Sequence, residues 1–104
     1  MPNVCINYMT IVSTMNDDIL RELKHIPTLH IMKHGDKAMK VRFETSSTPD
    51  FDWLESLNKR YNMWWIKDEW ISEDGPAGVW IATGNDIKRL DWNDLSLESE
   101  HYLF

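Results

Sequence analysis

The pattern of hydrophobic and polar positions begins with a strand and a helix. Residues 4–12 (VCINYMTIV) are rich in β-branched and apolar side chains on both alternating sets, which is typical of a strand in the middle of a covered sheet. Residues 15–26 then place apolar side chains at helical spacing. Pro27 ends this predicted helix, because a residue that precedes proline is pushed out of the helical region.

The middle of the chain predicts a hairpin followed by a second helix. In residues 38–46, Met39, Val41 and Phe43 alternate with charged residues, so we expect these three side chains to point into the core. Residues 49–61 carry an apolar stripe on one side, which predicts a helix that packs against the sheet through this stripe.

Two short runs, roughly residues 63–72 and 77–83, predict two further strands joined by the turn EDGP, and they contain four of the six tryptophans. In the second run Val79 and Ile81 alternate with Trp80. If Val79 and Ile81 face the helices, Trp80 lies on the opposite, open face of the sheet; the sequence leaves open which tryptophans belong to the core.

The open face would then be aromatic, because Ile6, Tyr8 and one of Trp64 or Trp65 are expected to lie beside Trp80. An exposed aromatic surface of this kind requires a cover. The cover is either the chain's own C-terminal tail, a second copy of the chain in a homodimer, or a foreign partner.

The order of these elements is β-α-β-β-α-β with one further strand. This order predicts the α+β class, as a ferredoxin-like sandwich: an antiparallel sheet with two helices on one face, plus an extra C-terminal strand and tail. A chain of 104 residues has the usual size of one domain. We expect a single domain, with the ferredoxin-like core in about residues 1–83 and an acidic extension in residues 84–104.

Two stretches resemble a known family. MPNVCINYMTI at the start of the chain, and FETSSTPDFDWLESLNKRY followed by an aromatic strand and Ala77-Gly78, resemble the YubB-like family of plasmid and phage proteins and its ferredoxin-like domain. Val4 departs from that family, which has an aromatic residue at this position. The resemblance implies an accessory protein of a mobile element and carries no assigned activity.

The charges are divided unevenly along the chain. The formal net charge is −6, but residues 68–104 contain only Lys88 and Arg89 against nine carboxylates, whereas residues 1–67 are close to neutral. This acidic third disfavours a nucleic-acid partner and favours a host protein with a basic surface. A structural alternative is a solvated acidic surface with no partner.

Candidate chemistry is sparse. Cys5 is the one cysteine, which excludes an internal disulfide, and we expect it to be a small buried core residue. His30 and His34 read as strand residues on a shared face about 13–14 Å apart, too far for one metal ion. The acids occur as adjacent pairs, which point to opposite faces of a strand. We therefore expect no enzyme, no cofactor and no metal site.

Location follows from two absences in the sequence. The chain has no apolar run long enough to span a membrane and no pattern of a signal peptide. With one cysteine and no disulfide, we expect a protein of the host cytoplasm that does not bind membranes.

Two functions follow from these observations. The first is binding to a host protein, as an anti-defence inhibitor or an inhibitor of a nucleic-acid-handling protein, with carboxylates for association and tryptophans as anchors. The residues expected to meet this partner are Trp64, Trp70, Trp80, Asp68, Glu69, Glu73, Asp74, Asp91 and Asp94. The alternative is single-stranded nucleic-acid binding through the aromatic sheet face. This alternative requires a second set of residues to border that face, namely Lys33, Lys37, Lys40 and Arg42.

Overall fold

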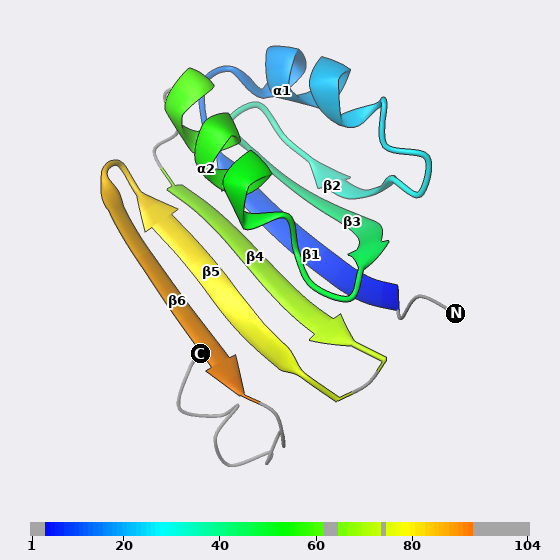
Figure 1. Ribbon diagram of the computed structural model, residues 1–104. Coiled ribbons are helices and arrows are strands. Elements are labelled where there is room, and N and C mark those ends of the chain that lie inside the picture. Colours follow the sequence, from blue (N-terminus) through cyan, green and yellow to red (C-terminus); the bar gives the residue numbers. More distant parts are fainter. Residues whose placement is uncertain (1–3, 62–64, 74, 93–104) are drawn as a thin grey trace.

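A computed structural model describes residues 4–61, 65–73 and 75–92 of the chain, with side chains to residue 91. The fold is α+β, with a six-stranded antiparallel sheet and two helices, which confirms the predicted class (Figure 1). The elements in chain order are β1 (Val4–Val12), α1 (Asn16–Leu23), β2 (His30–His34), β3 (Ala38–Ser46), α2 (Phe51–Arg60), β4 (Trp65–Ser72), β5 (Ala77–Thr83) and β6 (Asp86–Trp92).

The strands are arranged in the order β2-β3-β1-β4-β5-β6, and every neighbouring pair is antiparallel. β1 lies inside the sheet between β3 and β4, as its apolar composition predicts. β2 and β6 form the two edges; β5 is the further strand that the sequence predicts, and β6 adds a strand in the segment expected to be an acidic extension. Both helices lie on one side of the sheet (Figure 1), so the other side forms the open face.

The core lies between the sheet and the two helices. On β1 every second side chain from Cys5 to Ile11 is fully buried, whereas the side chains between them are half-buried. Met39, Val41 and Phe43 share the covered face with β1 and are at most 3% exposed, so their predicted orientation is confirmed. The helices contribute four buried side chains to this core: Ile19, Leu23, Leu54 and Leu57.

The helices are shorter than predicted. α2 begins at Phe51 because the Asp50 side chain caps it by accepting a hydrogen bond from the backbone N–H of Trp53 at 3.1 Å. α1 ends at Leu23, four residues before Pro27, in turns that continue to residue 29. Both ends of α1 are polar. Ile19 and Leu23 are its fully buried apolar side chains.

Glu22 joins the two helices. Its carboxylate accepts hydrogen bonds from three α2-side groups: the Trp53 indole at 3.3 Å, the Arg60 guanidinium at 2.7 Å and the Tyr61 hydroxyl at 2.9 Å. The Arg60 hydrogen bond is the main reason that the pKa of Glu22 falls to about 2. The helix layer is therefore held together by a partly exposed cluster of polar contacts around Glu22 as well as by apolar contacts.

Candidate functional site

The open face of the sheet is defined by the residues that alternate with the core. On β1 these are Ile6, Tyr8 and Thr10, all half-buried, and the position of Ile6 and Tyr8 on this face is as predicted. Trp65 of β4 pairs with Val12 and lies on the same face. The described open face therefore carries two aromatic rings, those of Tyr8 and Trp65.

Four lysines lie in one line across the open face. The strand register pairs Lys33 with Lys40, Lys40 with Thr10, and Thr10 with Lys67. The line continues from Lys67 through Ile81 to Lys88 on β6. We call Lys33, Lys40, Lys67 and Lys88 the lysine row. Because neighbouring strands lie about 4.8 Å apart, the row crosses all six strands over roughly 24 Å.

The two aromatic rings flank the lysine row on opposite sides. Tyr8 precedes Thr10 by two residues on β1, and Trp65 precedes Lys67 by two residues on the antiparallel β4. Each ring is therefore about 7 Å from the row along its strand. The Lys67 ammonium lies 5.6 Å from the centroid of the Trp65 ring, a cation–π contact that links the row to this ring.

Acidic residues on the open face neutralise only part of its positive charge. Arg42 lies 3.9 Å from Glu44, and Lys67 forms an ion pair with Glu69 at 2.8 Å. Within residues 4–61, 65–73 and 75–92, the other three members of the row form no ion pair; these are Lys33, Lys40 and Lys88. The row therefore presents ammonium groups to solvent with no carboxylate in its own line.

One end of the lysine row opens into a hollow at the β2–β3 hairpin. The hollow has a volume of about 640 Å³. Its lining consists of Thr10, Lys33, His34, Gly35, Ala38, Met39 and Lys40. It contains two lysines and no carboxylate, so its electrostatic potential favours an anion.

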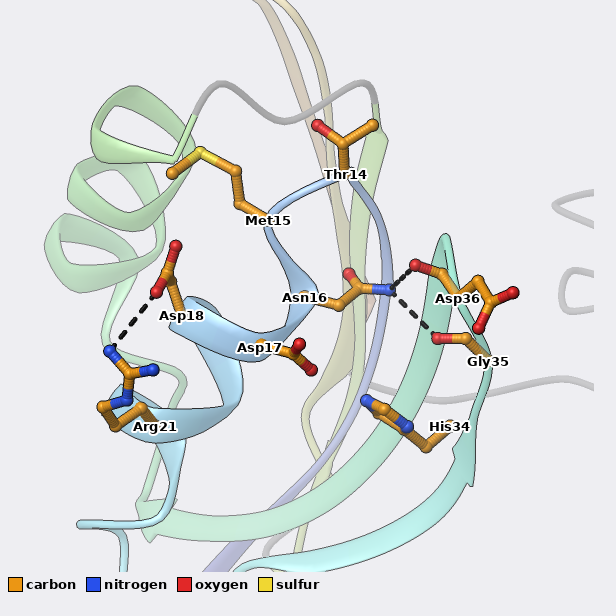
Figure 2. A pocket seen from close by; sticks show the side chains of 9 residues that line it. All are labelled: Thr14, Met15, Asn16, Asp17, Asp18, Arg21, His34, Gly35 and Asp36. Carbon is orange, nitrogen blue, oxygen red and sulfur yellow. Dashed lines mark hydrogen bonds and ion pairs between the residues drawn. The ribbon is translucent and has the colours of Figure 1, made fainter.

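A second hollow lies on the helix side of the same hairpin and has the opposite character (Figure 2). Its volume is about 420 Å³, and Asp17, Asp18 and Asp36 line it. The Asn16 amide, which is 3% exposed, donates to the backbone carbonyls of Gly35 and Asp36 at 3.3 Å each (Figure 2). This hollow therefore contains the contact that fixes the hairpin to α1.

The acidic hollow does not form a metal site. One carboxylate of the hollow, that of Asp18, already forms an ion pair with Arg21 at 3.3 Å, and Figure 2 shows this pair. In the part of the chain that the structure describes, no group of three or more His, Cys, Asp or Glu side chains is placed to hold a metal ion. The Asn16 contact is structural, and the hollow offers no converging set of ligands.

The tryptophans expected as anchors occupy the core. Trp80 is 1% exposed and Trp70 is 5% exposed, both on the helix-covered face, so the prediction that Trp80 lies on the open face is wrong. Val79 instead lies on the open face. The alternation was misleading because both sets of β5 side chains are apolar. A Cβ on Gly78 would lie 2.4 Å from the backbone oxygen of Leu90 and 2.7 Å from Cζ2 of Trp70, so the covered face has room only for glycine at this position.

The expected acids do not form one surface. Asp68 is fully buried on the covered face, where Met9 and Trp80 are its strand neighbours. Glu69 lies on the open face, and Asp91 lies beside Gly78 on the other face, paired with Arg89 at 2.9 Å. Glu73 is exposed after β4. Three expected partner-binding residues lie outside the described residues: Trp64, Asp74 and Asp94.

Burial also determines the chemistry of Asp68. Neither of its carboxylate oxygens has a hydrogen-bond partner among the residues that the structure describes. Desolvation is the main cause that raises its pKa well above the usual range, and the nearby Glu69 charge adds to it. Asp68 thus belongs to the interior and is not accessible to a partner.

Cys5 and the histidines show two further outcomes. Cys5 is fully buried, as predicted, and burial raises the pKa of its thiol to about 11, so it stays protonated at neutral pH. The expectation that His30 and His34 share a face is wrong. A register shift between Ile31 and Lys33 pairs His30 with open-face Arg42 and His34 with core-facing Met39.

The lysine row was the main feature that sequence reasoning missed. Lys33, Lys40 and Arg42 were recognised as a basic group, but Lys67 and Lys88 fell in the acidic third and its border. Their alignment depends on pairing between strands far apart in sequence, which the chain pattern does not specify. A lysine within four of the six strands, all except β1 and β5, was the one available signal.

The comparisons with other proteins add no relative. No protein-family model, curated protein or solved structure matches the chain. Among the described residues, no helix has the length and apolar character that crossing a membrane requires.

Proposed function

We propose that the protein binds single-stranded nucleic acid on the open face of its sheet. The observation that carries this proposal is the lysine row with Tyr8 and Trp65 on its two sides. Ammonium groups neutralise backbone phosphates, while aromatic rings beside them stack on unpaired bases. The condition set by the sequence is met for Lys33, Lys40 and Arg42, which share the face with Tyr8.

The distribution of charge between the two sides supports this proposal despite the net charge of −6. The open-face strand positions carry five cations and three carboxylates: Lys33, Lys40, Arg42, Lys67 and Lys88 against Glu44, Glu69 and Asp86. The helices and their caps carry six carboxylates and four cations. Local potential guides the approach of a ligand, because charges beyond about 8–10 Å are largely screened at physiological salt.

The fold class and lineage form a second part of the proposal. The order β2-β3-β1-β4, with α1 and α2 in the two connections on one side, supports assignment to the ferredoxin-like sandwiches, with β5 and β6 added at one edge. The resemblance of the two quoted stretches supports membership of the YubB-like family and an accessory role in a plasmid or phage. Neither assignment is needed for the binding proposal.

Inhibition of a host protein stays a prediction with less support from the geometry. Its expected anchors Trp70 and Trp80 lie in the core, and Asp68 is inaccessible. Reversal of Glu73, Asp74, Asp91 and Asp94 to lysine tests it directly. If a host partner binds through these acids, the fourfold variant associates more slowly and with weaker salt dependence.

The binding proposal is tested by fluorescence anisotropy with a labelled oligothymidylate at two salt concentrations. We expect binding at low salt, with a slope of log K against log salt of about −3 for four phosphate contacts. Lys33→Glu with Lys40→Glu should weaken binding by about tenfold or more. The matched control is Lys24→Glu with Lys59→Glu, which makes the same charge change at exposed positions of the helix layer.

Three results would contradict the proposal: no binding by the native protein, equal losses in both double variants, or equal affinity for duplex DNA. A concentration-dependent dimer, measured by light scattering, that is broken by Tyr8→Glu and binds no oligonucleotide would identify the open face as a homodimer interface. Circular dichroism melts confirm that each variant folds.

A further inference from the structure

The lysine row sets a direction on the open face. On β4 Lys67 is followed on the open face by Glu69, whereas on β3 Lys40 is followed by Arg42 and then by Glu44. Across the strands the row meets only Thr10 and Ile81 between its lysines. Along the described strands, adjacent positive charge extends no further than Lys40 and Arg42 on β3, so only a polyanion that crosses the strands meets cations on β2, β3, β4 and β6.

The row also has two different ends. At the β2–β3 hairpin it ends in the cationic hollow, where Lys33, Lys40 and Thr10 surround an open volume of about 640 Å³. At the other edge it ends at Lys88 on β6, whose open-face neighbour Leu90 is 51% exposed. The hairpin end offers two ammonium groups and a hydroxyl to one phosphate group, whereas the β6 end offers one ammonium group.

The open-face groups best suited to reading a base edge are either engaged or absent: the Arg42 guanidinium, which could read guanine, lies 3.9 Å from Glu44, and Lys67 pairs with Glu69. Side-chain amides, which commonly read base edges, are absent from the open-face strand positions that the structure describes. The described asparagines lie elsewhere: Asn7 and Asn16 are buried on the helix side, Asn58 is in α2 and Asn85 is in the β5–β6 turn. Ring stacking and ammonium–phosphate contacts tolerate every base.

We infer that the nucleic-acid strand crosses the sheet along the lysine row from the hairpin hollow to β6, occupies about four nucleotides and is bound without base preference. This inference rests on the proposed function and specifies its ligand. A footprint of this size follows from a row of roughly 24 Å, and it lies at the small end of the range for single domains.

A length series of oligothymidylates from two to twelve nucleotides tests the footprint. Affinity should rise steeply up to about four nucleotides and then increase only in proportion to the number of overlapping sites. Oligomers of four adenines or cytosines should bind within about threefold of thymines, since every base has a stacking face. Affinity that continues to climb steeply beyond eight nucleotides, or a strong preference for one base, overturns the inference.

Variants at the two ends test the path. With six thymines, Lys33→Glu and Lys88→Glu should each weaken binding by about fivefold or more, whereas Lys59→Glu on α2 should not. With two thymines, Lys33→Glu should keep its effect and Lys88→Glu should lose it, because a short strand occupies the hollow end. Equal effects of the two variants at both lengths would contradict the assigned path.

The outcomes separate this inference from the proposed function. If the native protein binds no oligonucleotide of any length, the proposed function is wrong. If it binds, but neither Lys33→Glu nor Lys88→Glu has an effect beyond the Lys59→Glu control, the path alone is wrong. Competition by polyglutamate as strong as by six thymines would show a site for any polyanion and would overturn the nucleic-acid assignment.

Discussion

Charged side chains have opposite surroundings on the two faces of the sheet. On the covered face, Asp68 is fully buried, and neither its oxygens nor the indole N–H of Trp70 has a hydrogen-bond partner among the described residues. On the open face, Lys67 and Arg42 lie beside carboxylates, and the lysine row is exposed at Lys33 and Lys88 and half-buried at Lys40 and Lys67. Buried charge lowers the stability of the fold, whereas charge on the open face adds a surface that a ligand can use.

The largest expected effect comes from replacing a tryptophan on each face by alanine and comparing the losses of stability. Trp80→Ala should destabilise the protein by about 3–5 kcal/mol, because it opens a cavity in the core. Trp65→Ala removes the same side chain from the open face and should cost less than about 1 kcal/mol while weakening oligonucleotide binding. Urea unfolding measures both stabilities. Similar losses from the two substitutions would contradict the assignment of faces.

Asp68→Asn is expected to have the next largest effect on stability, and the size of this effect should depend on pH. The pKa of Asp68 is raised in the folded state, so its contribution to stability is complete below about pH 3.8 and is lost as pH rises through the folded-state pKa. At pH 8 the asparagine variant should be more stable than the native protein, by on the order of 1–3 kcal/mol. Urea unfolding between pH 4 and pH 8 should show this gain growing with pH; a gain that shrinks with pH would refute it.

Glu22→Gln should show the opposite pH dependence with a smaller effect. The pKa of Glu22 falls from 4.5 to about 2 in the folded state, so its contribution is present above pH 4.5 and is lost as pH falls towards 2. We expect a loss of about 1–2 kcal/mol at pH 6, since one partly exposed carboxylate serves three donors. The difference between the native and variant proteins should disappear near pH 2, which thermal melts across this range will measure.

The sequence predicted the orientation of a strand correctly where its pattern allows only one face to be apolar. Met39, Val41 and Phe43 alternate with charged neighbours, so only one orientation buries them, and the structure has that orientation. β5 was different because both of its faces are apolar, and its covered face includes Gly78, where a Cβ would meet Leu90 of β6 and Trp70 of β4. A choice of this kind depends on residues from another strand and cannot be made from one segment.

The candidate site was predicted only in part for a related reason. Tyr8 was expected on the open face, and the alternation of β3 put Lys40 and Arg42 on the face opposite the core-facing Met39, Val41 and Phe43; the pairing of β1 with β3 that brings them together was not predicted. The extension of the row to Lys67 and Lys88 required the pairing of β4, β5 and β6, and net charge counted along the chain concealed it. Asp68 was expected at the surface because aspartate usually lies there, and its burial follows from the same pairing.

The register shift in β2 has a consequence for how this protein could change during evolution. Met32 is the additional residue between Ile31, which pairs with Val41, and Lys33, which pairs with Lys40. If Met32 instead paired regularly with Lys40, the following lysine would lie opposite Met39, on the side of the helices. A substitution that favoured this regular pairing would leave every charge in the chain unchanged and still remove one end of the lysine row. Deletion of Met32 would have the opposite outcome, because Lys33 would stay opposite Lys40; among related sequences, a gap at this position is therefore compatible with the same ligand-binding row.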